Sequence, residues 1–292
     1  MSTQPPYIGR FAPSPTGPVH FGTLLAAVGS YLQAKKNNGD WLLRMEDVDI
    51  TRRVEGADTD ILKTLEAFGF EWQGEVVYQS QRTGHYQQAL RSLLARELVF
   101  PCSCSRRQLA GLAVYPGTCR TRTLPACEEH ALRLCTDTIT VRFNDAVMGV
   151  QQQALASECG DFVIKRRDGL FAYQLAVVVD DALQGVTEIV RGADLLDSTA
   201  RQIYLQQKLD YPTPQYAHLP LAVDAQGKKI SKSEGASRVT IRDRERLLIR
   251  ALDFLGQLPP DELAGSSLDD IWRWAVMHWD IGRVPKKSRM PA

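Results

Sequence analysis

Apolar residues recur along the 292-residue chain with the spacings of both helices and strands. At residues 21–34 they fall three to four positions apart, which is typical of a helix with one buried face. Short apolar runs bounded by Gly, Pro or acidic residues are typical of buried strands. Such alternation predicts an α/β fold. The expected helices are residues 21–34, 56–68, 86–98, 240–255 and 272–277, and the expected strands are residues 7–11, 41–45, 138–143, 161–165 and 186–190.

The nearly continuous apolar run at residues 171–179 leads into Asp180 and Asp181. We expect the sheet to resume here, because a run without polar alternation suits a strand or helix that is covered on both sides. The two acids would then lie at its exit. At the other end of the chain, residues 284–292 are basic and contain proline, and we expect a frayed tail.

Composition is ordinary for a globular protein, with 44% apolar and 24% charged residues, and the net charge is +1. Such a balance gives no overall attraction to polyanions, so a nucleic-acid surface must come from local clustering. The chain opens with a polar segment and has no apolar run long enough for a membrane helix. Six cysteines without a secretory leader indicate a reducing cytoplasm, where thiols stay free or bind metal.

Residues 10–22, Arg-Phe-Ala-Pro-Ser-Pro-Thr-Gly-Pro-Val-His-Phe-Gly, join the first expected strand to the first expected helix. Their Pro and Gly residues interrupt regular structure. A strand, a turn and a helix N-terminus together present backbone N–H groups to an anion. His20 stands at the helix start, where its ring can reach a phosphate.

Residues 227–235, Gly-Lys-Lys-Ile-Ser-Lys-Ser-Glu-Gly, place three lysines and two serines between glycines. Such a loop is either a solvated basic surface or a clamp whose ammonium groups hold phosphate oxygens. Residues 228–250 contain eight Lys or Arg against three acids, a local charge of +5. This is the local basic clustering that the composition of the whole chain does not reveal.

In order and separation, the two stretches resemble the HIGH and KMSKS signatures of class I aminoacyl-tRNA synthetases. They read His-Phe-Gly-Thr at residues 20–23 and Lys-Ile-Ser-Lys-Ser at residues 229–233. The lead-in at residues 10–17 is similar to that of the glutamyl branch. The first signature departs from the family pattern at Thr23, where His or Gly is usual.

The resemblance implies a Rossmann-type catalytic core in which an amino-acid carboxylate attacks the α-phosphate of ATP and expels pyrophosphate. ATP would be a substrate, and Mg²⁺ would accompany it. No general base is needed, because the carboxylate is ionised near neutral pH. The implied catalytic residues are His20, Lys229 and Lys232, and the implied ATP contacts are His20, Gly22 and Lys232.

The resemblance also implies a glutamate site. Residues 44–49 match the family pattern Arg-x-Glu-Asp-x-Asp, in which Glu46 holds the α-amino group. Arg191 could pair with a carboxylate through two hydrogen bonds. Two arginines and one glutamate match the two carboxylates and one ammonium of glutamate, and which arginine takes the side-chain carboxylate stays open. The implied glutamate contacts are Arg10, Phe11, Ala12, Pro13, Ser14, Glu46, Tyr173 and Arg191.

Three cysteines and a tyrosine fall within residues 102–119. Structural zinc takes four ligands, most often thiolates, although scattered free thiols are an alternative here. One branch of the glutamyl family has a similar Cys-x-Cys followed by Tyr-x-x-x-Cys, which implies a structural zinc that fastens a small insert. The implied ligands are Cys102, Cys104, Tyr115 and Cys119, and Cys127 or His130 could replace the tyrosine.

The resemblance covers residues 7–242, and full-length glutamyl synthetases continue into a helical anticodon-binding part. This chain, with only about fifty residues after the second signature, is similar to a shorter branch that corresponds to the catalytic half alone and joins glutamate to queuosine in the anticodon of tRNA(Asp). We therefore expect a cytoplasmic, monomeric ligase that activates glutamate without tRNA and transfers it to that base. The alternatives are a truncated synthetase that charges the 3′ end of tRNA(Glu) and a non-enzymatic protein that binds tRNA or amino acid.

The expected domain organisation follows from the same resemblance. A Rossmann core is divided by an insert that carries the zinc-binding subdomain, and a short helical segment ends the chain. The expected bounds are residues 1–98 and 161–240 for the two halves of the core, 99–160 for the insert and 241–292 for the C-terminal segment.

Overall fold

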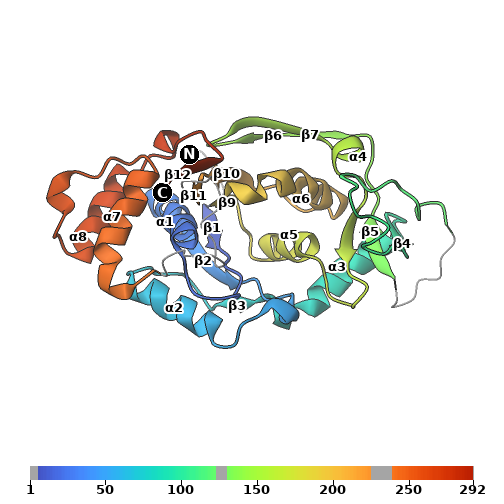
Figure 1. Ribbon diagram of the computed structural model, residues 1–292, viewed down its shortest axis with the longest axis horizontal. Coiled ribbons are helices and arrows are strands. Elements are labelled where there is room, and N and C mark those ends of the chain that lie inside the picture. Colours follow the sequence, from blue (N-terminus) through green and yellow to red (C-terminus); the bar gives the residue numbers. More distant parts are fainter. Residues whose placement is uncertain (1–5, 123–129, 225–238, 292) are drawn as a thin grey trace.

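The computed structural model of the protein describes residues 6–122, 130–224 and 239–291 (Figure 1). Lys229, Lys232 and Cys127, to which the sequence analysis gave roles, lie outside these residues. Across the described part of the chain, no helix is both long enough and apolar enough to cross a membrane.

A mostly parallel sheet lies at the centre of the molecule. Its strands are β1 (Ile8–Phe11), β2 (Asp40–Met45), β3 (Val77–Tyr78), β6 (Thr140–Asp145), β7 (Gly149–Ala154), β9 (Glu188–Gly192) and β10 (Gln215–Leu219). Pairing is parallel from β1 to β2, β2 to β3 and β9 to β10, and β6 adds to β10 with β7 antiparallel beside it. The N–H of Thr187 donates to the Ile8 carbonyl at 2.9 Å and places β9 beside β1. The order β3-β2-β1-β9-β10 is Rossmann-type and confirms the expected α/β fold.

Helices cover both faces of the sheet. The helices are α1 (Phe21–Lys36), α2 (Ala57–Ala67), α3 (Thr83–Ala95), α4 (Leu155–Glu158), α5 (Tyr173–Leu183), α6 (Leu196–Lys208), α7 (Arg244–Phe254) and α8 (Leu268–His278). α1 packs on one face and is covered by α7 and α8, whereas α5 and α6 lie on the other face (Figure 1). Each face therefore has a hydrophobic core of its own.

α1 fixes the edge of the central crevice. It follows the Pro- and Gly-rich turn of residues 12–18 and ends with Lys35 and Lys36, whose charges suit a helix C-terminus. Its middle lies so close to β10 that a Cβ added to Gly29 would come within 2.5 Å of a Leu219 methyl group. Glycine thus permits the close packing that brings the start of α1 to the ends of β1 and β9.

The expected strand at residues 171–179 is instead the helix α5, and Asp180 and Asp181 lie within it rather than at its exit. α3 and α6 pack against α5, so nearly all of its faces are buried and no helical alternation shows in the sequence. The prediction of a frayed tail at residues 284–292 is also wrong. Residues 289–291 form β12 (Arg289–Pro291), which pairs in parallel with β11 (Leu221–Val223).

A separate antiparallel sheet lies at one end of the molecule (Figure 1). It consists of β4 (Val99–Cys102), β5 (Ala131–Leu134) and β8 (Phe162–Lys165). Arg120 ties the loop after β4 to this sheet, because its Nη2 donates to the Thr136 carbonyl and to Asp161 Oδ1, both at 2.6 Å. None of the cysteines among the described residues is in a disulfide bond.

Candidate active site

Two adjoining cavities open where the chain order of the central sheet reverses, at the carboxyl ends of β1 and β9. Ligands of open α/β sheets bind at this point. One, which we call the switch-point cavity, has a volume of about 190 Å³, and the adjoining cavity has about 430 Å³. His20, Glu46 and Tyr173 line both. The candidate residues at the switch-point cavity are Arg10, Phe11, Ala12, Pro13, His20, Gly22, Glu46, Tyr173 and Arg191, and Ser14 lines the adjoining cavity.

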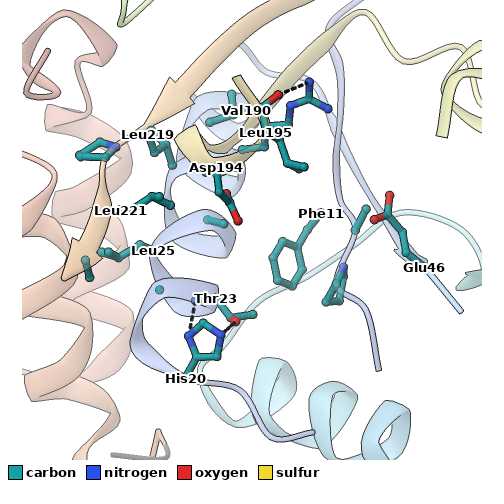
Figure 2. A pocket seen from close by; sticks show the side chains of 18 of the residues that line it. Phe11, His20, Thr23, Leu25, Glu46, Val190, Asp194, Leu195, Leu219 and Leu221 are labelled. Carbon is teal, nitrogen blue, oxygen red and sulfur yellow. Dashed lines mark hydrogen bonds between the residues drawn. The ribbon is translucent and has the colours of Figure 1, made fainter. Parts of the chain in front are cut away.

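His20 caps the N-terminus of α1 with extended backbone dihedrals. Its Nδ1 accepts a hydrogen bond from the Thr23 N–H at 3.3 Å, and its Nε2 lies 3.0 Å from Thr23 Oγ1 (Figure 2). Thr23, at which the first signature departs from the family pattern, thus orients the histidine ring. Since N–H groups at a helix start carry partial positive charge, the ring and the first turn of α1 together suit a phosphate.

Glu46 follows β2 and supplies a buried carboxylate to the cavity (Figure 2). Its Oε1 is buried without a hydrogen-bond partner among the described residues, and the Nη2 of Arg44 lies 3.7 Å away. Burial raises the pKa of Glu46 to about 7, although Arg44 and Arg10 act to lower it. A buried acceptor without a donor is unfavourable until a ligand supplies one, and an ammonium group would do so.

Arg10 lies near the carboxyl end of β1 and is held by Asp181 of α5. Its Nε lies 3.1 Å from Asp181 Oδ1, and Asp181 also accepts from Arg44 Nη2 at 2.7 Å. Burial works to raise the pKa of Asp181, but the two arginines outweigh it and hold the pKa below its usual range. The sequence analysis assigned no role to Asp181. The apolar run before it did not reveal the helix α5, which places the Asp181 carboxylate beside Arg10.

Arg191 lies on β9 and is 4% exposed. Its Nε donates to His218 Nε2 at 3.0 Å, and its Nη2 donates to Thr199 Oγ1 at 2.8 Å. Its Nη1 is buried without a partner among the described residues. The guanidinium is thus fixed on one side and has one unused donor group at the cavity that Arg191 lines.

Tyr173 begins α5 and lines both cavities. Burial raises its pKa above the ordinary value, with Glu46 adding to the shift. The hydroxyl therefore stays protonated and can donate a hydrogen bond to an anionic ligand. Together with Arg10 and Arg191 it gives the cavity donors for carboxylates, beside the carboxylate of Glu46 and the more exposed carboxylate of Asp194.

The second signature cannot be placed, since Lys229 and Lys232 lie outside the described residues. The described residues on either side of it are both near the first signature. Leu221 lines the switch-point cavity, and the N–H of Val239 donates to the Val19 carbonyl at 3.1 Å, directly before His20. The chain therefore leaves from the cavity wall and returns beside the start of α1.

The sulfur atoms of Cys102, Cys104 and Cys119 lie within 4.8 Å of one another in the insert. The Oη of Tyr115 lies 3.4 Å from Cys102 Sγ and 3.9 Å from Cys104 Sγ. Sulfur atoms around a tetrahedral zinc are about 3.8 Å apart, so this spacing fits a metal ion. Among the described residues, no histidine or carboxylate lies within the same group as the three thiols.

Comparison with known proteins connects this geometry to a family. The model of the family described as "tRNA synthetases class I (E and Q), catalytic domain" matches residues 8–113 and 120–254. The chain belongs to this family. Membership in the class I tRNA synthetases makes the protein an ATP-dependent ligase, implies ATP with Mg²⁺, an amino acid and a tRNA as partners, and confirms the family predicted from the two signatures.

Relatives of this class I tRNA synthetase are similar over nearly its whole length. The chain is 53% identical to the glutamyl-Q tRNA(Asp) synthetase of Aromatoleum aromaticum over 99% of its own length and 93% of the relative. Proteins of the same name from Dechloromonas aromatica and Pseudomonas aeruginosa are 52% and 51% identical, over 97% and 98% of this chain and 97% of each relative.

Solved structures show the same fold. The glutamate-tRNA synthetase of Elizabethkingia anophelis superposes with a TM-score of 0.81 at 24% identity. The superposition covers 99% of this class I synthetase and 68% of that chain. The protein therefore shares its fold with the matching part of that structure.

Proposed function

We propose that this protein activates glutamate with ATP and then joins it to queuosine in the anticodon of tRNA(Asp). The observation that carries the choice of amino acid is the charge pattern of the switch-point cavity, where two buried arginines meet Glu46, whose side chain is 9% exposed. The acceptor follows from the name shared by relatives that are 51–53% identical over 97–99% of the chain. We propose a cytoplasmic monomer, as the sequence predicts.

In this proposal the cavity binds glutamate through its charges. Glu46 receives the α-ammonium, and Arg10, Arg191 and Tyr173 receive the two carboxylates. Phe11, Ala12, Pro13 and Ser14 form the wall along the strand end from which Arg10 projects. A neutral amino acid such as glutamine would leave one buried arginine donor without an anionic partner, which is costly.

The activation step joins two anions, so it needs cations and N–H donors. An oxygen of the glutamate α-carboxylate attacks the α-phosphorus of ATP, a P–O bond forms, and the bond to pyrophosphate breaks. We assign His20 to the phosphoryl oxygens, with Gly22 at the adjacent helix start. Lys229 and Lys232 would neutralise the charge that develops on the leaving pyrophosphate. Mg²⁺ would arrive with ATP.

The transfer step consumes the mixed anhydride. A hydroxyl oxygen of the cyclopentenediol of queuosine attacks the acyl carbon, an ester forms and AMP leaves with its electron pair. The hydroxyl proton passes to the leaving phosphate or to solvent. Activation precedes this step and does not use tRNA in our proposal.

We further propose that the insert, residues 99–160, holds a structural zinc ion on Cys102, Cys104, Cys119 and Tyr115. The support is the spacing of the sulfur atoms and the position of the Tyr115 hydroxyl beside them. Among the described residues, Phe100, Cys102 and Cys119 form a small hydrophobic core beside this cluster, and a bound metal ion would add to its stability. The division into core, insert and C-terminal segment stays a prediction.

The deciding experiment measures glutamate-dependent exchange of pyrophosphate into ATP without tRNA, followed by charging with labelled glutamate. Exchange without tRNA is expected. Queuosine-containing tRNA(Asp) that lacks its 3′-terminal adenosine should be labelled, and queuosine-free tRNA(Asp) should not. Exchange that requires tRNA(Glu), with label at its 3′ end, would instead identify a truncated conventional synthetase. Absence of exchange and labelling would identify an accessory binding protein.

A further inference from the structure

A set of buried polar groups that belongs to neither signature holds Arg191. We propose that Asp145, His218 and Thr199 are positioning residues that orient Arg191 toward a glutamate carboxylate and thereby set the affinity for glutamate. The inference rests on the proposed function, because it takes glutamate as the ligand of the cavity. It assigns roles to residues from β6, β10 and α6, which lie outside the sequence motifs.

The hydrogen bonds in this set have one consistent direction. Arginine has only donors, so His218 Nε2 must accept the bond from Arg191 Nε at 3.0 Å. The proton of the neutral imidazole then lies on Nδ1, which donates to Asp145 Oδ2 at 2.6 Å. Burial lowers the pKa of His218, which agrees with a neutral ring. Asp145 thus selects the tautomer that can hold Arg191.

Asp145 itself cannot turn away. Its Oδ1 accepts backbone N–H groups from Val147 at 3.0 Å, Met148 at 2.8 Å and His218 at 3.1 Å. Both oxygens are therefore used, and Asp145 and His218 are fully buried. β6 pairs with β10, and this pairing brings the two residues together across 73 positions of sequence.

The remaining contacts leave one donor group for the ligand. Thr199 accepts from Arg191 Nη2, and its Oγ1 lies 3.2 Å from the Leu195 carbonyl, so the hydroxyl is fixed. The guanidinium lies over the Tyr216 ring at 5.4 Å. Only Nη1 is buried without a partner among the described residues.

The neutral histidine explains why this arrangement suits an anion. Arg10 is paired with the carboxylate of Asp181, which offsets part of its charge. Arg191 is instead held by the lone pairs of His218 and Thr199, neither of which carries a negative charge. Its positive charge stays available to a carboxylate in a buried site, where electrostatic attraction is strong.

Asp145→Asn gives the sharpest test. The amide oxygen can keep the three backbone N–H bonds, but the amide NH₂ then faces His218 Nδ1 and forces the proton to Nε2. Nε2–H would oppose Arg191 Nε–H, so the bond to Arg191 is lost without a change in size. We expect the KM for glutamate to rise about tenfold in pyrophosphate exchange, with kcat and the KM for ATP within about twofold. Nitrogen-15 NMR of labelled histidine should show the tautomer change.

His218 provides a second pair of variants. His218→Leu removes the acceptor and should raise the KM for glutamate at least as much, whereas His218→Gln keeps an acceptor and a donor and should recover part of the loss. Gln206→Leu is the matched control, because it removes a buried hydrogen bond to the Tyr216 hydroxyl from the same region but none to Arg191. It should leave the KM for glutamate unchanged.

Two failures can be told apart. If the wild type shows no glutamate-dependent exchange, the proposed function is wrong and this inference falls with it. If the wild type is active and Asp145→Asn and His218→Leu keep the wild-type KM for glutamate, only the positioning role is wrong. A rise in that KM equal to the rise in Gln206→Leu would also overturn the inference, because it would reflect general loosening of the core.

Discussion

The switch-point cavity and the cysteine cluster of the insert hold their polar groups in different ways. In the cavity, Arg10 and Arg191 are bonded to partners that come from separate helices and strands. In the insert, the thiols lie against one another and one tyrosine, with a small core beneath. A cavity built on hydrogen bonds within the protein is formed before its ligand arrives, whereas in our proposal a metal ion would hold the thiols in place.

The difference predicts that the two regions can be damaged separately. Changes in the cavity should alter glutamate affinity without loss of metal. Changes in the cluster should alter metal content and stability without loss of glutamate affinity. Each prediction below challenges this separation.

Arg191→Ala should have the largest effect. It removes the cavity arginine that is not in a direct ion pair among the described residues, and we expect the KM for glutamate in pyrophosphate exchange to rise more than about 100-fold. Arg191→Lys keeps the charge but not the paired donors, so an intermediate value is expected. Zinc content should not change. A KM for glutamate within threefold of the wild type would exclude Arg191 from the binding site.

Loss of the metal should destabilise the insert and spare the cavity. We expect Cys102→Ser to lose one equivalent of zinc, measured by metal analysis, and to lower Tm by about 5 °C. Its KM for glutamate should stay within about twofold of the wild type. Cys159→Ser, which lies outside the cluster, is the control and should keep the metal. A wild-type protein without zinc would contradict the proposed site.

The pH dependence of glutamate binding tests Glu46. Its pKa is raised to about 7, so the carboxylate is ionised above that pH and protonated below it. Binding of the substrate ammonium needs the ionised form. The affinity for glutamate should therefore decrease as the pH is lowered. At pH 6 about one tenth of the sites are ionised, and the Kd from calorimetry without ATP should be about tenfold higher than at pH 8. Glu46→Gln should bind weakly at every pH, and a wild-type Kd independent of pH would contradict the role of Glu46.

The sequence predicted the residues that line the cavity better than the residues that hold them in position, because the lining residues lie in short local motifs. Arg10, His20 and Glu46 stand at the ends of strands or the start of a helix, inside short motifs that identify them. Asp145 and His218 meet only because β6 pairs with β10, and nothing distinguishes either from an ordinary buried polar residue in the sequence.

The same limit explains the error in α5. Helical periodicity shows only when one face meets water, and α5 is buried on nearly all sides, so its residues fit a strand as well as a helix. The cysteine cluster was predictable because Cys-x-Cys and a third cysteine carry the chemistry in their spacing. The resemblance also implied Tyr115 as the fourth ligand, with Cys127 or His130 as alternatives, and the Tyr115 hydroxyl lies 3.4 Å from Cys102 Sγ.

The smallest effect is expected at the junction between the insert and the catalytic core, where Arg120→Met removes the bonds to Asp161 and to the Thr136 carbonyl. Buried Asp161 would still accept the hydrogen bond from the Thr136 N–H in this variant. The Arg120 side chain is 41% exposed, so solvent screens its ion pair with Asp161. We expect the free energy of unfolding of Arg120→Met, measured by urea denaturation, to fall by about 1 kcal/mol. Lys208→Met is the control, because it breaks the more exposed ion pair of Lys208 with Asp137 and should have a smaller effect. The KM for glutamate should not change in either variant. If Arg120→Met raised that KM severalfold, the insert and the cavity would be coupled through β8, and their separation would be wrong.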